Sequence, residues 1–343
     1  MRFRGWRHRT VTTLAGPVTV WRAYWHCAGC GTGVHPADAG WALPEEGASW
    51  AVQTHAALLG TLQPFRQAAE MLHRLTGLSV SARSIETWTE RVGAAYRPPT
   101  LGPHEPGPAP DVEVLAVDAV MVCFHDGWHE EKVAMAWQLQ DGEARPPRYV
   151  TGEGPWDTCG PALQELTRRE GRRRAGTLVC VADGAHAIWR LLTREFPEAV
   201  QILDWYHVQE HLAEVATALG ADGPAWHKRQ RDALETRGPV PVLWTLRRLM
   251  HTGTTKAVRE AARGCFTYLW WHRTRMEYPT AIARGYPIGS GRIESACKQV
   301  VQQRAKQAGM RWSHPHLQTV LAARCAFLSG DWDLAGEQYK QAA

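Results

Sequence analysis

Three acidic residues occupy positions in this sequence that suit metal-dependent chemistry. Asp118 interrupts a nearly continuous apolar run over residues 113–122, and Asp183 directly follows a second apolar run. Glu294 comes just after the Gly289–Gly291 break, in the first turn of an expected helix. A carboxylate within an apolar strand costs free energy unless it is compensated, and Mg²⁺ compensates carboxylates well. The alternative is structural, because an acid at a strand end or in a first helical turn also stabilises the helix that follows.

Two such ions about 3.5–4 Å apart can activate a water and stabilise the leaving oxygen of a phosphodiester. We therefore predict a two-metal Mg²⁺ site that is held by these three acids, in which Mn²⁺ can substitute. Acids that are so far apart in sequence need a fold that brings strand ends together.

The pattern after residue 110 predicts such a fold. Apolar runs predict strands, first as a hairpin and then in alternation with helices, which implies a mixed α/β sheet. From His207 to about Arg275 the pattern is helical, and two more helices follow. The strands are expected over 113–122, 132–137, 177–182 and 199–203, and the helices over 161–169, 185–196, 290–308 and 314–328.

The part before residue 97 is organised differently. Residues 10–26 alternate apolar and polar positions, which predicts a hairpin that leads into Cys27 and Cys30. Residues 49–93 have helical spacing that is interrupted by Gly77, and this matches a helix-turn-helix outline. An ordinary helical hairpin remains the alternative. Six prolines between Arg97 and Pro110 predict an extended linker.

The net charge of +5 is concentrated at the N-terminus, because residues 1–35 contain five arginines and no acid. This asymmetry suggests contact with a polyanion. A second basic stretch runs from Arg284 to Arg311, where six basic residues accompany one acid, Glu294. It predicts a face that follows DNA phosphates beside a catalytic carboxylate.

Composition excludes several classes of protein. Hydrophobic residues make up 44% and charged residues 21%, which excludes a mainly disordered chain. The N-terminus lacks the apolar region of a secretory signal, and no apolar run is long enough to span a membrane. Eight cysteines are too few for a disulfide scaffold. We expect buried thiols in a reducing cytoplasm.

Four segments carry a family resemblance, in consistent order and spacing. The segments are Asp183–Trp189, Asp204–Val208, Tyr286–Lys298 and Gly309–Ser313. The most specific block is Ile288-Gly-Ser-Gly-Arg-Ile-Glu-Ser295. The four segments resemble the DDE transposases of bacterial insertion sequences, most of all the ISKra family, over about residues 10–330. The resemblance implies a bacterial cytoplasmic protein that is at the nucleoid when it is bound to DNA.

The resemblance implies an RNase H-like catalytic fold with an all-helical insertion. It makes Asp118, Asp183 and Glu294 the catalytic, Mg²⁺-binding acids. It implies a supporting role for Asp204, His207, Ser290 and Gly291. Basic and aromatic residues of both basic stretches are the expected DNA contacts, with Trp312 either stacked on a base or part of the core. These contacts are Arg292, Lys298, Arg304, Lys306, Arg311, Trp312, Arg2, Arg4, Arg7 and Arg9.

Cys27 and Cys30 form a Cys-x-x-Cys knuckle, which supplies two of the four ligands that a structural zinc ion needs. Family members commonly carry another such pair upstream of the hairpin, and this chain departs from that pattern. His8, His26 or His35 are the remaining candidates for completing a site. Zinc binding therefore stays open.

The expected function is metal-dependent DNA cleavage and strand transfer at insertion-sequence ends, by homo-oligomers in a synaptic complex. The partners are double-stranded terminal inverted repeats and target DNA, and no membrane is involved. A catalytically silent DNA-binding relic or regulator is the alternative. The expected regions are a basic hairpin with a zinc-ribbon-like knuckle (1–45), a helix-turn-helix-like region (46–96), a linker (97–110), a catalytic domain (111–206 and 276–330), a helical insertion (207–275) and a tail (331–343).

Overall fold

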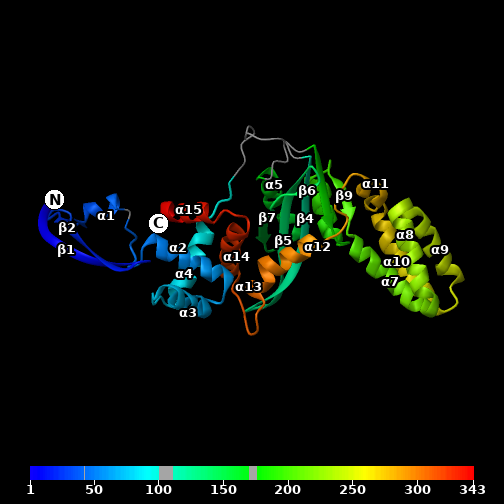
Figure 1. The fold of residues 1–343 in the computed structure, drawn as a ribbon, viewed down its shortest axis with the longest axis horizontal. Coiled ribbons are helices and arrows are strands. Elements are labelled where there is room, and N and C mark those ends of the chain that lie inside the picture. Colours follow the sequence, from blue (N-terminus) through cyan, green and yellow to red (C-terminus); the bar gives the residue numbers. More distant parts are fainter. Residues whose placement is uncertain (42, 100–110, 170–175) are drawn as a thin grey trace. The chain divides into compact units, whose positions relative to one another are not determined.

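The computed structural model describes residues 1–41, 43–99, 111–169 and 176–343, and these form two compact units (Figure 1). The first unit contains residues 1–98, the hairpin tip 123–126 and residues 303–343. The second contains residues 99–122 and 127–302. Most of the expected proline-rich linker, residues 100–110, lies outside the described residues. No helix among the described residues has the length and apolar character to cross a membrane.

The first unit begins with a long antiparallel hairpin. Its strands, β1 (Arg2–Thr13) and β2 (Gly16–His26), pair from Arg2 opposite His26 to Thr13 opposite Gly16. The register shifts between Phe3 and Trp6, around Gly5 with its φ of 106°. A short strand and a short helix follow, β3 (Gly33–Val34) and α1 (Pro36–Gly40). The predicted hairpin is thus present and starts earlier than its alternating pattern indicated.

Five helices form the core of the first unit. The central one is α4 (Ala82–Ala95), which packs against the other four. Gly77 ends α3 with a φ of 74° and the Ser81 side chain caps α4, which fits both a helix-turn-helix and an ordinary helical hairpin. Figure 1 shows these helices grouped together. The four are α2 (Trp50–Leu62), α3 (Phe65–Thr76), α14 (His314–Leu328) and α15 (Trp332–Ala342).

The C-terminal region belongs to this unit, which corrects two predicted boundaries. Residues 303–330 were assigned to the catalytic domain and 331–343 to a tail. Instead, α14 approaches α4 so closely that a Cβ on Gly93 would lie 1.8 Å from the carbonyl oxygen of Thr319. Tyr339 of α15 donates a hydrogen bond to Gln53. The hydrophobic face of the N-terminal helices is buried only when these C-terminal helices cover it.

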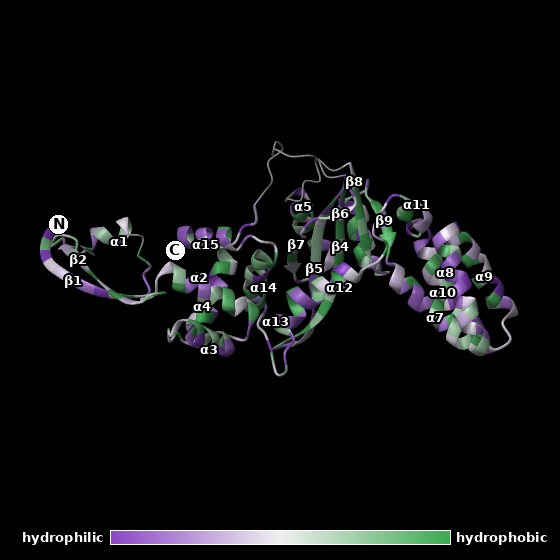
Figure 2. Ribbon diagram, in the orientation of Figure 1, coloured by the Kyte–Doolittle hydropathy of each residue, from purple (hydrophilic) through white to green (hydrophobic). Residues whose placement is uncertain are grey.

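The second unit is built on a mixed sheet with the order β6–β5–β4–β8–β9, and β7 pairs with β5. Strand β4 runs parallel to β8, and β8 runs parallel to β9. In Figure 2 these three strands are largely green, as expected for strands that are buried in a core. This confirms the expected mixed α/β class. The strands are β4 (Val112–Phe124), β5 (Gly127–Gln140), β6 (Glu143–Ala144), β7 (Arg148–Gly152), β8 (Thr177–Ala182) and β9 (Val200–Leu203).

Helices complete the second unit. Helices α5 (Gly160–Arg169) and α6 (His186–Glu195) connect its strands. After β9, the chain forms a helical group before it returns to the segment that carries Glu294, and that segment packs against β5 (Figure 1). That segment is α12 (Gly291–Ala296), which continues as a π-helical stretch, Cys297–Gln302. The helical group comprises α7 (Trp205–Leu219), α8 (Gly223–Arg237), α9 (Pro239–Thr252) and α10 (Lys256–His272), and α11 (Tyr278–Ala283) follows.

Candidate catalytic site

Strand register brings the predicted aspartates to one edge of the sheet. Ala116 of β4 pairs with Val181 of β8, and an aspartate follows each of them two residues later, Asp118 and Asp183. Ala182 of β8 pairs with Leu203 of β9, so that Asp204 stands level with Asp183. Asp204 also donates its backbone N–H to the carbonyl of Ala182, at 2.9 Å. Three carboxylates therefore lie at one level on three adjacent parallel strands.

Asp204 links this edge to the helices that follow. It is fully buried, and its Oδ2 accepts hydrogen bonds from the backbone N–H of His207 at 2.9 Å and from His207 Nδ1 at 2.6 Å. Its Oδ1 accepts the backbone N–H of Ser290 at 2.5 Å. Burial alone would raise the pKa of Asp204, but these hydrogen bonds outweigh burial and lower it. Asp204 is therefore an ionised anchor that caps α7 and holds the chain before Glu294.

His207 is the cationic group of the site. The hydrogen bond with Asp204 raises the pKa of His207 to about 9 against the opposing effect of burial, and the negative charge of Asp183 adds to the rise. The side chain remains 40% exposed. At neutral pH the site thus contains a partly exposed imidazolium beside its carboxylates.

Glu294 is connected to this network through Ser290. The Ser290 hydroxyl, which is buried, donates to Glu294 Oε1 at 2.7 Å, and the Glu294 backbone N–H donates to the Ser290 carbonyl. One turn later, Cys297 donates its Sγ–H to Asp118 Oδ2 at 3.5 Å. Burial raises the pKa of Cys297, and the charges of Asp118 and Glu294 raise it further, so this group stays a thiol.

Cys297 is a residue of the site that we did not single out from the sequence. Its spacing of three residues from Glu294 is the available signal, because residues at i and i+3 share one face of a helix. Its contact with Asp118 places the Glu294 helix against β4. The three predicted acids are thereby connected through the second unit, although far apart in sequence.

Burial raises the pKa of Asp118, and the charge of Asp183 acts in the same direction. This electrostatic coupling agrees with the register, because it requires the two carboxylates to be neighbours. In the described residues, only two groups of three side chains have ligand atoms that all lie within 4.8 Å of one another. Neither group contains Asp118, Asp183 or Glu294, so the oxygens of these three acids do not all lie within that distance.

The helical group contacts the site at Gly184, directly after Asp183. A Cβ at Gly184 would lie 2.2 Å from the ring of Tyr268 in α10, so a side chain here would require Tyr268 to move. The Asp183 carbonyl accepts a hydrogen bond from Trp189 Nε1 at 2.6 Å, and Asp183 Oδ1 accepts one from the Ala185 N–H at 2.9 Å. The second acid is therefore held by its own loop and by packing from α10.

The predicted basic face beside Glu294 is only partly present. Arg292 and Lys298 are exposed on the Glu294 helix, and the Arg292 guanidinium lies 4.9 Å from the ring centroid of Trp137. Lys306 and Arg311 are exposed as well, but they belong to the first unit.

Arg304 and Trp312 are buried, so the prediction of Arg304 as a DNA contact is wrong, and of the two alternatives for Trp312 the core position is the one observed. Arg304 is 1% exposed, donates to the carbonyl of Gly60 at 2.8 Å and lies over the rings of Phe65 and Trp312. Trp312 is 8% exposed and donates its Nε1–H to the Ala305 carbonyl. The helices of the first unit cover both side chains, which the local basic pattern could not reveal.

The N-terminal arginines divide in a similar way. Arg2 and Arg4 are exposed on β1, and Arg7 is exposed with its guanidinium 5.8 Å from the ring centroid of Tyr24. Arg9 instead donates to three successive carbonyls, those of residues 44–46, at 2.5–2.7 Å. Its role is to hold this loop on the hairpin, so it is not a free DNA-contacting cation.

Cys27 and Cys30 form a local knuckle. The Gly31 N–H donates to the Cys27 carbonyl, and Gly31 has a φ of 73°. Hydrogen bonds with Thr32 lower the pKa of Cys30 to about 7. Among the described residues, none of His8, His26 and His35 joins both sulfurs in a compact ligand group. These three histidines therefore do not complete a compact zinc site with the two sulfurs.

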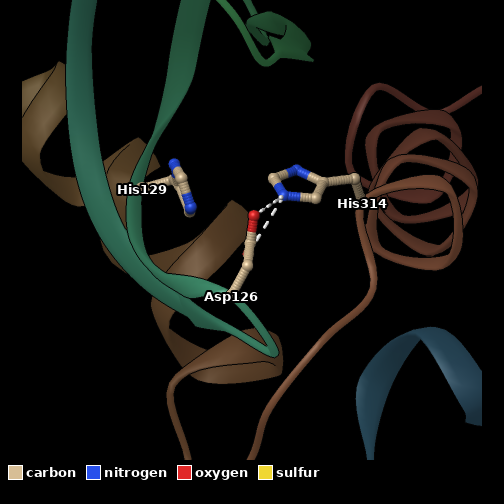
Figure 3. A group of neighbouring side chains, drawn as sticks. All are labelled: Asp126, His129 and His314. Atoms are coloured by element: carbon tan, nitrogen blue, oxygen red, sulfur yellow. Dashed lines mark hydrogen bonds and ion pairs between the residues drawn. The ribbon is translucent and has the colours of Figure 1, made fainter.

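Two groups of side chains in the described residues have ligand atoms close enough to hold a metal ion. Glu86, Glu90 and His316 lie within the first unit. The other group is Asp126, His129 and His314 (Figure 3). His314 Nε2 lies 3.3 Å from both oxygens of Asp126, and His129 follows Asp126 by three residues along the chain. His129 belongs to the second unit, so only the Asp126–His314 pair is internal to one unit.

Comparison with models of known protein families and with curated proteins finds no match to this sequence. The functional argument therefore depends on the site itself.

Proposed function

We propose that the second unit catalyses metal-dependent cleavage and transfer of DNA phosphodiesters, as a DDE transposase of the ISKra type. The observation that carries the proposal is the alignment of Asp118 and Asp183 on adjacent parallel strands, with Glu294 brought to Asp118 through Cys297. The strand order and the helical group before Glu294 also fit the RNase H-like fold with a helical insertion that the resemblance implies.

The donor set fits Mg²⁺, because all three groups are carboxylates and Mg²⁺ prefers hard oxygen ligands. We propose two ions that are shared between the three acids, as expected from the sequence. Asp118, on β4 next to the strand that ends at Asp183 and in contact with the Glu294 helix, would contact both ions, and Asp183 and Glu294 would each hold one. Bound there, the ions would activate the attacking hydroxyl and stabilise charge on the leaving oxygen.

The remaining residues of the site position the Glu294 carboxylate and neutralise the charge of DNA phosphates. Asp204 and Ser290 orient the Glu294 carboxylate through the chain of hydrogen bonds described above. The imidazolium of His207 offers its free Nε2–H to a non-bridging phosphate oxygen, because its Nδ1 is occupied by Asp204. Arg292 and Lys298, which are exposed on the helix that carries Glu294, neutralise further phosphates of the same DNA. Arg2, Arg4 and Arg7 are the proposed contacts of the hairpin with double-stranded terminal repeats.

A strand-transfer assay tests this proposal. Labelled duplexes that carry the genomic DNA flanking the gene, pre-cleaved to end in a 3′-hydroxyl, are incubated with supercoiled plasmid and Mg²⁺ or Mn²⁺. We expect joined products that disappear on chelation and in Asp118→Asn, Asp183→Asn and Glu294→Gln. Glu260→Gln, which removes an exposed acid of α10, is the matched control and should keep activity.

Three outcomes separate the alternatives. Metal-dependent joining that persists in Asp118→Asn would overturn the assignment. End-specific DNA binding without cleavage at any metal concentration would support the catalytically silent relic. Cleavage without joining and without preference for the flanking ends would point to a nuclease on the same site.

A further inference from the structure

The helical group of the second unit carries an aromatic groove on its surface. The groove has a volume of about 430 Å³ and lies between α9 and α10, extending to Glu277 before α11. Its walls include Trp244 of α9 and Trp270 of α10, which are 64% and 48% exposed. Exposed aromatic and apolar side chains that gather in one groove mark a binding surface, whereas scattered ones do not.

Each of these tryptophans carries an arginine one helical turn later. The Arg247 guanidinium lies 5.6 Å from the ring centroid of Trp244, and the Arg273 guanidinium lies 4.4 Å from that of Trp270. Arg273 is held in place because it donates to the Trp270 carbonyl at 2.8 Å. Phe266 stacks on Trp270 with a centroid distance of 5.8 Å and an interplanar angle of 14°. Two planar tryptophan–arginine pairs thus line one groove.

The charge of this region complements a polyanion. Residues 236–276 contain eight basic residues and a single acid, Glu260. The groove itself contains Arg247, Arg273 and one carboxylate, that of Glu277. A surface that combines cations with exposed aromatic faces matches the way in which proteins bind single-stranded nucleic acid, with bases stacked on aromatic rings and phosphates paired with arginine.

We propose that the α9–α10 groove binds unpaired bases of a DNA strand, stacked on Trp244 and Trp270 with the flanking phosphates on Arg247 and Arg273. This deepens the proposed function on which it rests, because DNA cleavage and joining expose frayed or displaced strands. Unpaired bases fit better than a duplex, since base faces in a duplex are already stacked on one another. The carboxylate of Glu277 is positioned to accept hydrogen bonds from exocyclic amino groups.

The test measures DNA binding independently of cleavage. The full-length protein is titrated against a short fluorescein-labelled single-stranded oligonucleotide, and against its duplex, by fluorescence anisotropy in EDTA. Stacking on one aromatic side chain contributes about 1–3 kcal/mol, which corresponds to a loss of affinity of about 5- to 160-fold. We expect this loss for single-stranded DNA in Trp244→Ala and Trp270→Ala, and near-retention in Trp270→Phe.

The chain offers matched controls on the same helices. Trp271 is 63% exposed but does not line the groove, and Arg248 is exposed beside Arg247. Trp271→Ala and Arg248→Gln should change the affinity by less than Trp270→Ala and Arg247→Gln do. Asp118→Asn should keep single-strand binding while cleavage is lost, which separates a failure of this proposal from a failure of the proposed function.

Several results would overturn the proposal. One is single-strand affinity that is unchanged in Trp244→Ala and Trp270→Ala, or lowered equally in Trp271→Ala. Another is an equal loss of duplex and single-strand binding, which would assign the groove to duplex DNA. A third is conversion of a dimer to a monomer in sedimentation, without any effect on DNA, which would make the groove an interface between copies of this chain.

Discussion

The charge of His207 should stabilise the second unit at acid and neutral pH and lose that effect in alkali. The pKa of this imidazole is raised from 6.5 to about 9 in the folded protein. A group with a raised folded pKa contributes its full stabilisation below the unfolded pKa, and the contribution disappears as the pH passes the folded pKa. The stabilisation should therefore be complete below about pH 6.5 and absent well above about pH 9.

The magnitude follows from the shift and from the exposure of the side chain. One pKa unit corresponds to about 1.4 kcal/mol, so a rise from 6.5 to about 9 sets an upper bound of about 3.4 kcal/mol. The side chain is 40% exposed, and solvent screens such a charge, so we expect about 1–2 kcal/mol. The lowered pKa of Asp204 reflects the same contact and is not counted again.

Urea unfolding of the wild type and of His207→Gln, at pH values from about 6 to about 10, measures this contribution. In this variant the backbone N–H of residue 207 still donates to Asp204, which caps α7, but the titrating imidazole ring is absent. The difference in unfolding free energy should be about 1–2 kcal/mol at pH 6 and should shrink towards zero at pH 10. Groups that titrate elsewhere affect both proteins and cancel in this difference.

Two results would refute the reasoning. One is a pair of stability curves that stay parallel over the whole pH range. The other is an NMR titration in which the His207 ring loses its proton near pH 6.5, because the ion pair with Asp204 would then contribute little.

Three further predictions concern packing. Gly93→Ala should lower the unfolding free energy by about 1–3 kcal/mol, because its methyl group would collide with the Thr319 carbonyl. Arg304→Met should lower the unfolding free energy by about 1.5–3 kcal/mol, because the hydrogen bond to the Gly60 carbonyl is lost. Urea unfolding measures this change. The folded variant should keep the DNA affinity of the wild type. Gly184→Ala should reduce strand transfer by displacing Tyr268 and the loop of the second acid, measured by initial rate on folded protein.

Gly264→Ala is the control for both glycine variants. This glycine lies in α10, and the position that a Cβ would take there is open, so alanine should be neutral or slightly stabilising. If Gly264→Ala lowered stability as much as Gly93→Ala, or strand transfer as much as Gly184→Ala, the close contacts would not be the cause of these losses.

Much of the local structure was predictable from the sequence. Apolar runs that end in Asp183 and Asp204 indicated strands, because burial of such runs requires a sheet. Gly77 marked the turn between α3 and α4, since a left-handed φ favours glycine. These features depend on neighbours within a few residues, and they are present as expected.

The sequence alone thus determined which residues have the chemistry for a site: three carboxylates, a histidine and flanking cations. Only the tertiary structure decided which of them meet. Register between β4, β8 and β9 aligned the aspartates, while helix packing from both ends of the chain buried Arg304. The physical reason is that register and burial depend on contacts between segments distant in sequence, whereas strand, turn and cap signals depend on local ones.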